Sequence, residues 1–377
     1  MRKKVVIAQH RLLHYRVKFF EQLHEKAQAE GIDLHLLHGQ PSPEEAKKRD
    51  TGVIEWADVV TNRFWRLGNT DLLWQPVPPH LRDADLFVLL HQNRLLSNYP
   101  IMLSQRLAGR KVAFWGHGAN FQSTSPGDLK ERWKRWQIDK VDFWFAYTGI
   151  TVELLRKVGV PDGRIVNLNN AVDTSEFRAQ CEAVMPEEVG ALRAELGIPE
   201  GAPTAVFCGS LYPEKRLDLM VAACDIVRTR LPDFHLAVIG SGPSLGSLEE
   251  AARERPWLHP VGIRMGVEKA RYFRMAQIML NPGLLGLHIL DAFCAGLPLV
   301  STRNALHSPE IAYVRDGENG FLTDDTPEAY AEAVLRILSD PAFGRAVAEN
   351  ALAASRIYTL ENMVDRFMDG LRTCLAL

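Results

Sequence analysis

Short runs of apolar and β-branched residues alternate along this chain with stretches whose apolar positions recur every three or four residues. One series of runs lies at residues 5–8, 34–37, 86–90, 111–116 and 142–147, and a second at 204–209, 235–240, 277–282 and 297–302. Runs of this kind predict buried strands, and the stretches between them predict amphipathic helices. Because strand and helix in alternation favour a parallel sheet, the two series predict an α/β chain with two doubly wound domains.

The connection between the predicted domains lies within residues 171–203, where prolines and glycines stand among charged residues around a short helical stretch. We place the first domain at 1–185 and the second at 186–358, which suits a length of 377 residues. Residues 359–377 predict a last helix with an apolar stripe of Met363, Phe367 and Leu371. We expect this helix to pack back on the first domain.

Composition narrows the class of protein only a little. The chain is 46% hydrophobic and 24% charged with a net charge of −2, which is ordinary for a globular protein and gives no basic stripe for nucleic acid. Five cysteines are scattered without a close pair, so neither a disulfide framework nor a zinc cluster is indicated. No segment reaches the ~20 apolar residues of a membrane span. We expect a cytoplasmic protein that can still lie against the inner face of a membrane.

Two glycine-containing stretches of the second half carry most of the chemical information. GSLYPEKRLDL begins at Gly209 and NPGLLGLHILDAFCAGLPLV begins at Asn281, each after a predicted strand and before a predicted helix. Such a junction points backbone N–H groups at a bound phosphate. A nucleotide-type ligand is therefore the first hypothesis, although such turns also occur for steric reasons alone.

With these motifs on two such domains, the chain resembles the GT-B glycosyltransferases, specifically the large retaining family 4 (group 1), over nearly its whole length. The resemblance implies two Rossmann-like domains that face each other across a cleft, with the C-terminal helix crossing back to the first domain. It also implies that a nucleoside-diphosphate sugar binds the second domain, that the acceptor binds the first, and that no metal or other cofactor is required.

The resemblance implies a donor site with three departures from the family pattern, of which Asp291 keeps the carboxylate. Gly209 and Lys215 match the Gly-Arg turn and the lysine that neutralise the diphosphate, but Ser210 replaces the arginine. In the family's pair of glutamates, Gly283 replaces the first and Asp291 the second, where it is expected to bind ribose hydroxyls. The full predicted donor set is Gly209, Ser210, Lys215, Gly242, Arg264, Met265, Gly283, Gly286, Leu287, His288 and Asp291.

The replacement of the family's first glutamate by Gly283 has two possible explanations. The lost glutamate would bind donor-sugar hydroxyls, each worth about 1.5–3 kcal/mol when the acceptor is charged. Either the donor is a sugar that lacks or substitutes that hydroxyl, such as a deoxy or acylated amino sugar, or the chain is a non-catalytic relic of the fold.

In the first domain the resemblance implies that His117, within Gly-His-Gly after a strand, is the catalytic residue that faces the donor sugar. The segment after the first strand predicts acceptor binding through His10, Arg11, His14, Tyr15 and Arg16. The alternative is that these residues brace the first helix.

Residues 128–140 form a second basic cluster in which Lys130, Arg132, Lys134 and Arg135 stand beside Trp133 and Trp136. Cations next to tryptophans suit an anionic membrane surface or a lipid-pyrophosphate acceptor. A solvated helix that buries both tryptophans explains the same pattern.

The sequence therefore predicts a retaining hexosyltransferase-type enzyme that moves a sugar from a nucleoside diphosphate to a saccharide or lipid-linked saccharide, as in bacterial polysaccharide or lipopolysaccharide biosynthesis. A non-catalytic sugar-nucleotide binding or scaffold protein stays open because of Ser210 and Gly283. A nucleotide-sugar epimerase would need several cleft carboxylates, and the cleft motifs offer Asp291 alone. A dehydrogenase is disfavoured because no G-x-G-x-x-G follows the first strand.

Overall fold

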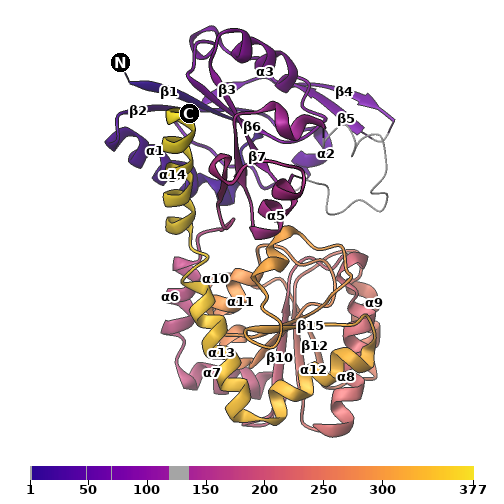
Figure 1. Cartoon of the computed structure of the whole chain (residues 1–377). Coiled ribbons are helices and arrows are strands. Elements are labelled where there is room, and N and C mark those ends of the chain that lie inside the picture. Colours follow the sequence, from indigo (N-terminus) through magenta and orange to yellow (C-terminus); the bar gives the residue numbers. More distant parts are fainter. Residues whose placement is uncertain (1, 48, 69, 119–135) are drawn as a thin grey trace. The chain divides into compact units, whose positions relative to one another are not determined.

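The computed structural model describes residues 2–47, 49–68, 70–118 and 136–377 (Figure 1). The chain forms two compact units, of which the first comprises Met1–Asp173 with Leu360–Leu377 and the second comprises Thr174–Thr359. The boundary lies nearer the N-terminus than residue 185 because helix α6 (Ser175–Ala183) packs on helices of the second unit.

The first unit is built on a seven-stranded parallel sheet in the order β3-β2-β1-β6-β7-β8-β9. Its strands are β1 (Lys3–Arg11), β2 (Ile32–Gly39), β3 (Asp58–Val60), β6 (Leu86–Leu90), β7 (Lys111–Gly116), β8 (Phe143–Ala146) and β9 (Ile165–Asn167). A separate antiparallel hairpin consists of β4 (Arg63–Leu67) and β5 (Thr70–Trp74). The strand order reverses between β1 and β6.

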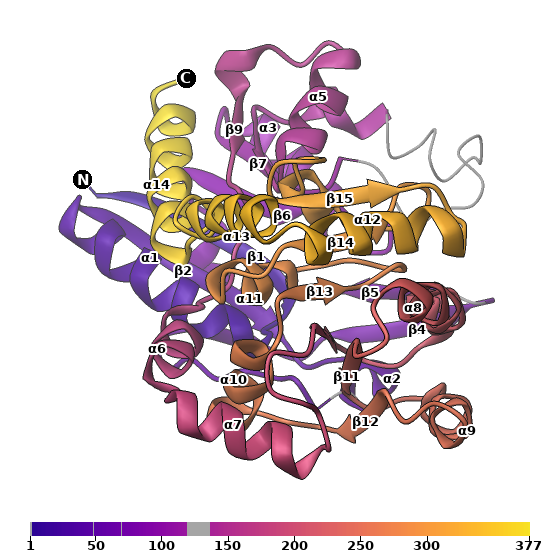
Figure 2. The same cartoon turned by 90° about the horizontal axis from the view of Figure 1, so that it is seen from below.

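Helices cover both faces of this sheet. They are α1 (Val17–Ala29), α2 (Pro43–Ala46), α3 (Asn98–Leu107), α5 (Gly149–Lys157) and the C-terminal α14 (Leu360–Ala376). On one face α14 lies beside α1 in both views, and Phe367 of α14 stacks on Phe145 and contacts the rings of Phe19 and Trp115 (Figures 1 and 2). On the other face α3 and α5 pack on the strands through residues such as Ile101 and Leu155. The predicted stripe of the last helix is confirmed as buried.

The second unit has a six-stranded parallel sheet in the order β12-β11-β10-β13-β14-β15. Its strands are β10 (Thr204–Cys208), β11 (His235–Ile239), β12 (Leu258–Gly262), β13 (Ile278–Leu280), β14 (Leu299–Thr302) and β15 (Gly320–Thr323). On one side of the sheet, β11 and β12 follow β10 outward, and on the other side β14 and β15 follow β13 outward. This is the strand order of a dinucleotide-binding Rossmann sheet.

The helices of the second unit also form two layers. They are α6, α7 (Pro186–Glu195), α8 (Leu217–Arg230), α9 (Leu245–Arg253), α10 (Gly266–Met275), α11 (Ile289–Cys294), α12 (Pro327–Ser339) and α13 (Pro341–Ser355). The core under α8, α9 and α12 contains Met220, Leu248 and Val334. Helices α10 and α11 pack with α6, α7 and α13. Both doubly wound parallel-sheet units that the apolar runs predicted are therefore confirmed.

Some predictions for residues 128–140 lie outside the described residues, because Lys130, Arg132, Trp133, Lys134 and Arg135 all precede residue 136. Trp136 is described, and half of its surface is exposed while the Lys140 ammonium lies 5.3 Å from its ring centroid. In the described part of the chain, no helix is both long and apolar enough to cross a lipid bilayer.

Candidate functional site

The donor-site motifs of the sequence meet at one place in the second unit. Gly209 follows β10 and Asn281 follows β13, and these two strands are neighbours at the point where the strand order reverses. In open parallel sheets, ligands bind outside the carboxyl ends of the strands at this switch point. The topology therefore places both glycine-containing stretches at the expected ligand crevice.

Lys215 is the buried cation of this site. It ends a short 3-10 helix, η5 (Pro213–Lys215), and only 6% of its surface is exposed. Its ammonium donates a hydrogen bond to the carbonyl oxygen of Leu284, in the loop after β13. Burial lowers the pKa of Lys215 to about 8. An anionic ligand beside Lys215 would restore interactions that the ammonium lost with water.

Gly283 is fixed by packing, whatever the ligand. A Cβ atom at this position would lie 2.0 Å from the carbonyl oxygen of Glu214 and 2.4 Å from the carbonyl carbon of Lys215. The next residue, Leu284, donates its N–H to the same Glu214 oxygen over 2.8 Å. Any side chain at 283 would therefore push the β13 loop away from η5, the segment that carries Lys215.

The loop from Asn281 to His288 is held by a hydrogen bond to His307, while the backbone N–H groups at its end have no acceptor among the described residues. Leu285 donates its N–H to His307 Nδ1 at 3.2 Å, and His307 Nε2 donates to the carbonyl of Thr302 at 2.7 Å. The amides of residues 286–288 have no hydrogen-bond acceptor among the residues that the structure describes. Three consecutive N–H groups near Lys215 are suited to the oxygens of a phosphate.

His288 is a neutral member of this loop. Burial holds the pKa of His288 well below its ordinary value, and the Lys215 and Lys269 ammonium groups lower it further. Asn281 Nδ2 donates to His288 Nε2 at 2.7 Å, which leaves the proton of the ring on Nδ1. His288 can therefore donate one hydrogen bond to a ligand without adding charge.

Asp291 is paired, which the sequence did not predict. Its Oδ2 accepts from Lys269 Nζ of α10 at 2.7 Å, and both side chains are mostly buried. The Lys269 ammonium also lies 4.0 Å from the ring centroid of Phe177. Burial lowers the pKa of Lys269, but the Asp291 carboxylate outweighs it and keeps the pKa above its usual value. A ribose hydroxyl at Asp291 would share the carboxylate with this cation.

The remaining predicted donor residues lie around the same edge. A Cβ at Gly242 would come within 2.7–2.9 Å of three backbone atoms of Leu211, so glycine is needed for the approach of these two loops. Ser210 is exposed after β10. Arg264 and Met265 follow the outer strand β12, and Met265 is 77% exposed.

Sequence reasoning missed several residues that shape this edge. They are Lys269, Asn281, Arg216, Thr302 and His307. Arg216 has a left-handed backbone conformation with φ of 54° and donates to Asp325 at 2.8 Å and to Thr302 at 3.2 Å. Thr302 in turn donates to the carbonyl of Pro282 at 2.6 Å. The only sequence signal for Arg216 was its place directly after Glu214 and Lys215, because its hydrogen-bond partners lie far along the chain.

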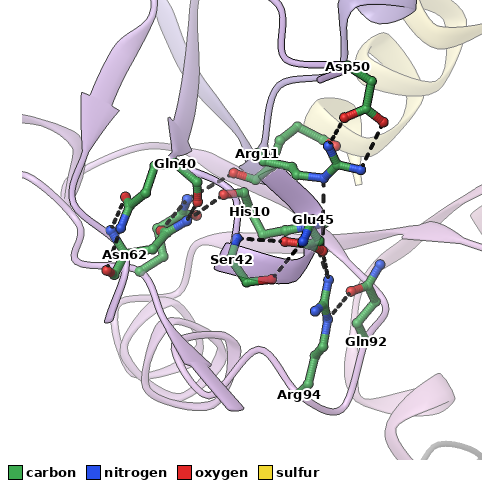
Figure 3. Close-up of polar contacts among 11 residues, drawn as sticks. His10, Arg11, Gln40, Ser42, Glu45, Asp50, Asn62, Gln92 and Arg94 are labelled. Carbon is green, nitrogen blue, oxygen red and sulfur yellow. Dashed lines mark hydrogen bonds and ion pairs between the residues drawn. The ribbon is translucent and has the colours of Figure 1, made fainter. Parts of the chain in front are cut away.

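At the corresponding edge of the first unit, His10 and Arg11 belong to a dense polar network (Figure 3). Glu45 Oε1 lies 3.1 Å from His10 Nε2 and accepts from Arg94 at 2.9 Å, while Arg11 donates to both oxygens of Asp50. Burial alone would raise the pKa of Glu45, but its hydrogen bonds with His10, Ser42 and Arg94 hold it well below the usual range. The positive charges of Arg11 and Arg94 are thus largely balanced by the carboxylates of Asp50 and Glu45.

The other predicted acceptor residues differ in accessibility. His14 is exposed and Tyr15 is half-buried, so both can meet a ligand. Arg16 is 6% exposed and donates to the carbonyl of Ala171 at 3.2 Å and to the side chain of Asn170. These contacts favour the bracing alternative for Arg16, whereas the acceptor role of the set stays a prediction.

His117 follows β7 at the carboxyl edge of the first sheet. Its ring packs against Tyr147 in a T-shaped contact with centroids 4.2 Å apart. The position agrees with the strand end that the sequence indicated. The catalytic role itself stays a prediction.

A cavity of 550 Å³ lies at the opposite edge of the second sheet. Its lining includes Pro203, Gln277 and Leu297, which precede β10, β13 and β14, together with Arg274 and Arg345. Ligands of open parallel sheets bind at the carboxyl ends of the strands, so we do not assign the nucleotide to this cavity.

The fold agrees with that of solved structures over nearly the full length. The protein Alr3699/HepE from Anabaena, solved with UDP, has a TM-score of 0.68 at 13% identity, covering 98% of this chain and 99% of that one. A putative UDP-N-acetylglucosamine 2-epimerase from Listeria monocytogenes has a TM-score of 0.61 at 12% identity, covering 99% and 96%. This chain is a GT-B protein, and at such identities the likeness establishes the fold alone.

Residues 202–340 match the family model described as glycosyl transferases group 1. A mannosyltransferase from Mycolicibacterium smegmatis, named as GDP-mannose-dependent and acting on phosphatidylinositol monomannoside, is 30% identical over 216 residues, which cover 54% of this chain and 53% of that protein. The match thus spans about half the length of this curated relative. Both matches include the second unit, so the likeness to group 1 glycosyl transferases lies chiefly in the domain that carries the switch point.

Proposed function

We propose that this protein is a retaining glycosyltransferase that moves a sugar from a nucleoside diphosphate to a hydroxyl of a saccharide or lipid-linked acceptor. The observation that carries the proposal is the composition of the switch point in the second unit. There a buried lysine lies together with three backbone amides that have no acceptor in the described part of the chain, in the domain that matches the group 1 model. A diphosphate would supply negative charge and oxygen atoms to accept hydrogen bonds from the ammonium and the backbone N–H groups.

In this proposal, Lys215 and the amides of residues 286–288 hold the donor's diphosphate and stabilise the charge that develops as it leaves. Fixed donors aimed at a developing charge stabilise a transition state more than a ground state. Asp291, through its carboxylate, orients the ribose, and Lys269 fixes that carboxylate in place. His117 and the first unit's edge remain the predicted catalytic residue and acceptor face.

The relatives support a hydroxyl acceptor on a phosphorylated or lipid-linked polyol. Similar proteins include a D-inositol 3-phosphate glycosyltransferase and the phosphatidylinositol monomannoside mannosyltransferase. The exposed His14 and the half-buried Tyr15 at the first unit's edge could contact the hydroxyls of such an acceptor. A role in bacterial surface-glycan assembly, at the inner face of a membrane, follows from an acceptor of this kind.

The decisive experiment is a transfer assay with the purified full chain. UDP-, GDP- and dTDP-sugars are first ranked by thermal shift, and the best donor is incubated with and without inositol phosphates, simple glycosides and lipid-linked saccharides. We expect sugar transfer with retained anomeric configuration, or slow donor hydrolysis when no acceptor fits. Transfer with inversion would contradict the retaining assignment.

A second candidate is a non-catalytic protein that binds sugar nucleotides. Gly283 favours it, because the packing of η5 on the β13 loop excludes any acidic side chain at that position. Tight donor binding without hydrolysis, and without transfer to any acceptor, would favour this candidate over the enzyme. An epimerase would instead convert the bound sugar nucleotide to a second one, which chromatography of the same reaction mixtures detects.

A further inference from the structure

Two histidines and one aspartate meet at the edge of the first unit's sheet, on segments that are distant in sequence. His35 lies on β2, Asp58 begins β3, and His80 lies in a 3-10 helix at Pro79–Leu81 that precedes β6. The nearest nitrogen or oxygen atoms of the three side chains all lie within 4.8 Å of one another. They take no part in the donor site or in the polar network of Figure 3.

The sheet itself brings two of these residues together. Asp58 pairs with Leu37, which is two residues beyond His35 on the same strand. Since residues two apart on a strand point to the same face, His35 and Asp58 project side by side. His80 is held in place by Lys4, whose ammonium donates to the His80 carbonyl at 2.8 Å and pairs with Asp83. The cluster is therefore built on positioned backbone segments.

The distances suit a shared cation. His35 Nδ1 lies 3.0 Å from Asp58 Oδ2, and His80 Nε2 lies 2.8 Å from Asp58 Oδ1. A tetrahedral zinc ion with bonds of about 2.0–2.2 Å spaces its ligand atoms roughly 3.3–3.6 Å apart. Small side-chain adjustments of a few tenths of an ångström would admit such an ion.

His35 has carboxylates on both sides of its ring. Asp33 Oδ2 lies 3.3 Å from Nε2, opposite the Asp58 oxygen at Nδ1. In metal sites, a carboxylate on the far nitrogen of a ligating histidine is a recurrent arrangement. Asp33 Oδ2 lies close enough to take that position after a small rotation, although His35 Nε2 is buried and has no hydrogen-bond partner among the described residues.

We propose that His35, Asp58 and His80 bind a divalent transition-metal ion of the zinc class, with Asp33 orienting His35. Two imidazoles and a carboxylate are ligands that zinc accepts, and three protein ligands leave a position for water. Side-chain exposure of 24% for His35, 19% for Asp58 and 57% for His80 gives the ion access from solvent. The bound ion would join β2, β3 and the segment before β6, and so stabilise the sheet edge.

The test is isothermal titration of the chelator-stripped full chain with ZnCl₂, followed by visible absorption with Co²⁺ in its place. We expect one strong site per chain and a higher Tm with zinc, since an ion that binds only the folded state stabilises it. His35→Gln and Asp58→Asn should abolish this site. Asp33→Asn, at a half-exposed position, should keep the fold and weaken zinc binding by about 10- to 100-fold.

His14→Gln is the matched control, because it removes an exposed histidine of the same unit outside the cluster, and its zinc affinity should equal that of the unaltered protein. No strong zinc or cobalt binding by the unaltered protein would overturn the proposal. Equal binding by the His35→Gln variant would overturn it as well.

Discussion

At the scale of single residues, Lys215 is the most important residue of the proposed donor site. Its ammonium is desolvated, and the hydrogen bond to the Leu284 carbonyl replaces only part of its hydration. A diphosphate completes that environment, and the lysine then acts as a point charge against the ligand. Ser210 provides no cation, so the account gives Lys215 a larger share of donor affinity than a site with two cations would.

Lys215→Met should therefore weaken UDP or GDP binding. The charge-assisted hydrogen bond that is lost is worth about 1.5–3 kcal/mol, which corresponds to about a 10- to 150-fold rise in Kd. Isothermal titration calorimetry measures this directly. Lys157→Met, at an exposed position ending α5, is the control and should bind as the unaltered protein does. Equal affinity in the Lys215 variant would remove this residue from the site.

The pH dependence of binding follows from the same lysine. In the free protein burial brings its pKa to about 8, so the side chain is a cation below that pH and neutral above it. A bound diphosphate favours the cation and raises the pKa of the complex. Nucleotide affinity should thus be constant from pH 7 to nearly 8 and then fall by up to about tenfold per pH unit. Affinity that does not change between pH 7 and 9.5 would contradict the assignment.

The residue scale also shows where sequence reasoning stops. The positions of Gly209, Lys215 and Gly286 at strand ends were predictable, because apolar runs mark the strands and each motif directly follows one. The reason why position 283 must be glycine was not predictable, since the atoms that exclude a side chain there belong to residues 214 and 215, almost seventy positions earlier. Lys269 gave no signal at all, because an ion pair between two helices depends on their packing.

At the scale of elements, the contact between η5 and the β13 loop is the feature that shapes the donor site. Gly283→Ala would place a methyl group against the Glu214 carbonyl and should destabilise the second unit by about 1–3 kcal/mol. Gly246→Ala is the control, because nothing lies within 4 Å of its Cβ position and it stands in helix α9. Its stability should be unchanged or higher by up to about 1 kcal/mol.

Thermal denaturation of both glycine variants, with and without UDP, separates stability from binding. The Gly283 variant should also lose nucleotide-induced stabilisation, since Lys215 shifts with η5. A Gly283→Ala protein as stable and as responsive to nucleotide as the control variant would show that the close contact is absent in solution.

Arg16 links another set of elements. Its guanidinium joins the start of α1 to the Ala171 carbonyl and to Asn170, and lies 5.5 Å from the Trp115 ring centroid. Arg16→Leu should destabilise the first unit by about 2–3 kcal/mol, because two buried acceptors lose a charged donor. Urea unfolding followed by tryptophan fluorescence reports mainly on this unit, since Trp257 is the one tryptophan of the second.

The control for that measurement is His14→Ala, an exposed change expected to stay within about 0.5 kcal/mol. Normal stability of the Arg16 variant together with impaired acceptor use would instead support the acceptor role that the sequence predicted for this residue.

Secondary structure was predictable where strands are apolar and central. The nine runs named from the sequence correspond to β1, β2, β6, β7, β8, β10, β11, β13 and β14. The runs did not indicate the four edge strands β3, β9, β12 and β15, nor the hairpin strands β4 and β5. Among the edge strands, β12 contains Pro260, β3 and β9 have three residues each, and β15 is the four-residue segment GFLT. Edge strands need fewer apolar positions and tolerate proline, so their sequences carry a weaker pattern.

At the scale of the whole molecule, we propose different tasks for the two units. The second carries a site suited to a nucleoside diphosphate at its switch point, and the first carries a polar edge with arginines, histidines and acids. The last helix was predictable because its apolar stripe of Met363, Phe367 and Leu371 has the spacing of a buried helix face. This stripe packs on the aromatic core of the first unit.

The central claim is that the diphosphate of a sugar nucleotide binds at the carboxyl edge between β10 and β13. A crystal structure of the full chain with the best-binding nucleoside diphosphate tests it most directly. The account predicts phosphate oxygens within hydrogen-bonding distance of Lys215 Nζ and of the amides of residues 286–288. Electron density for the nucleotide in the cavity beside Arg274 and Arg345, with the β10–β13 edge unliganded, would contradict it.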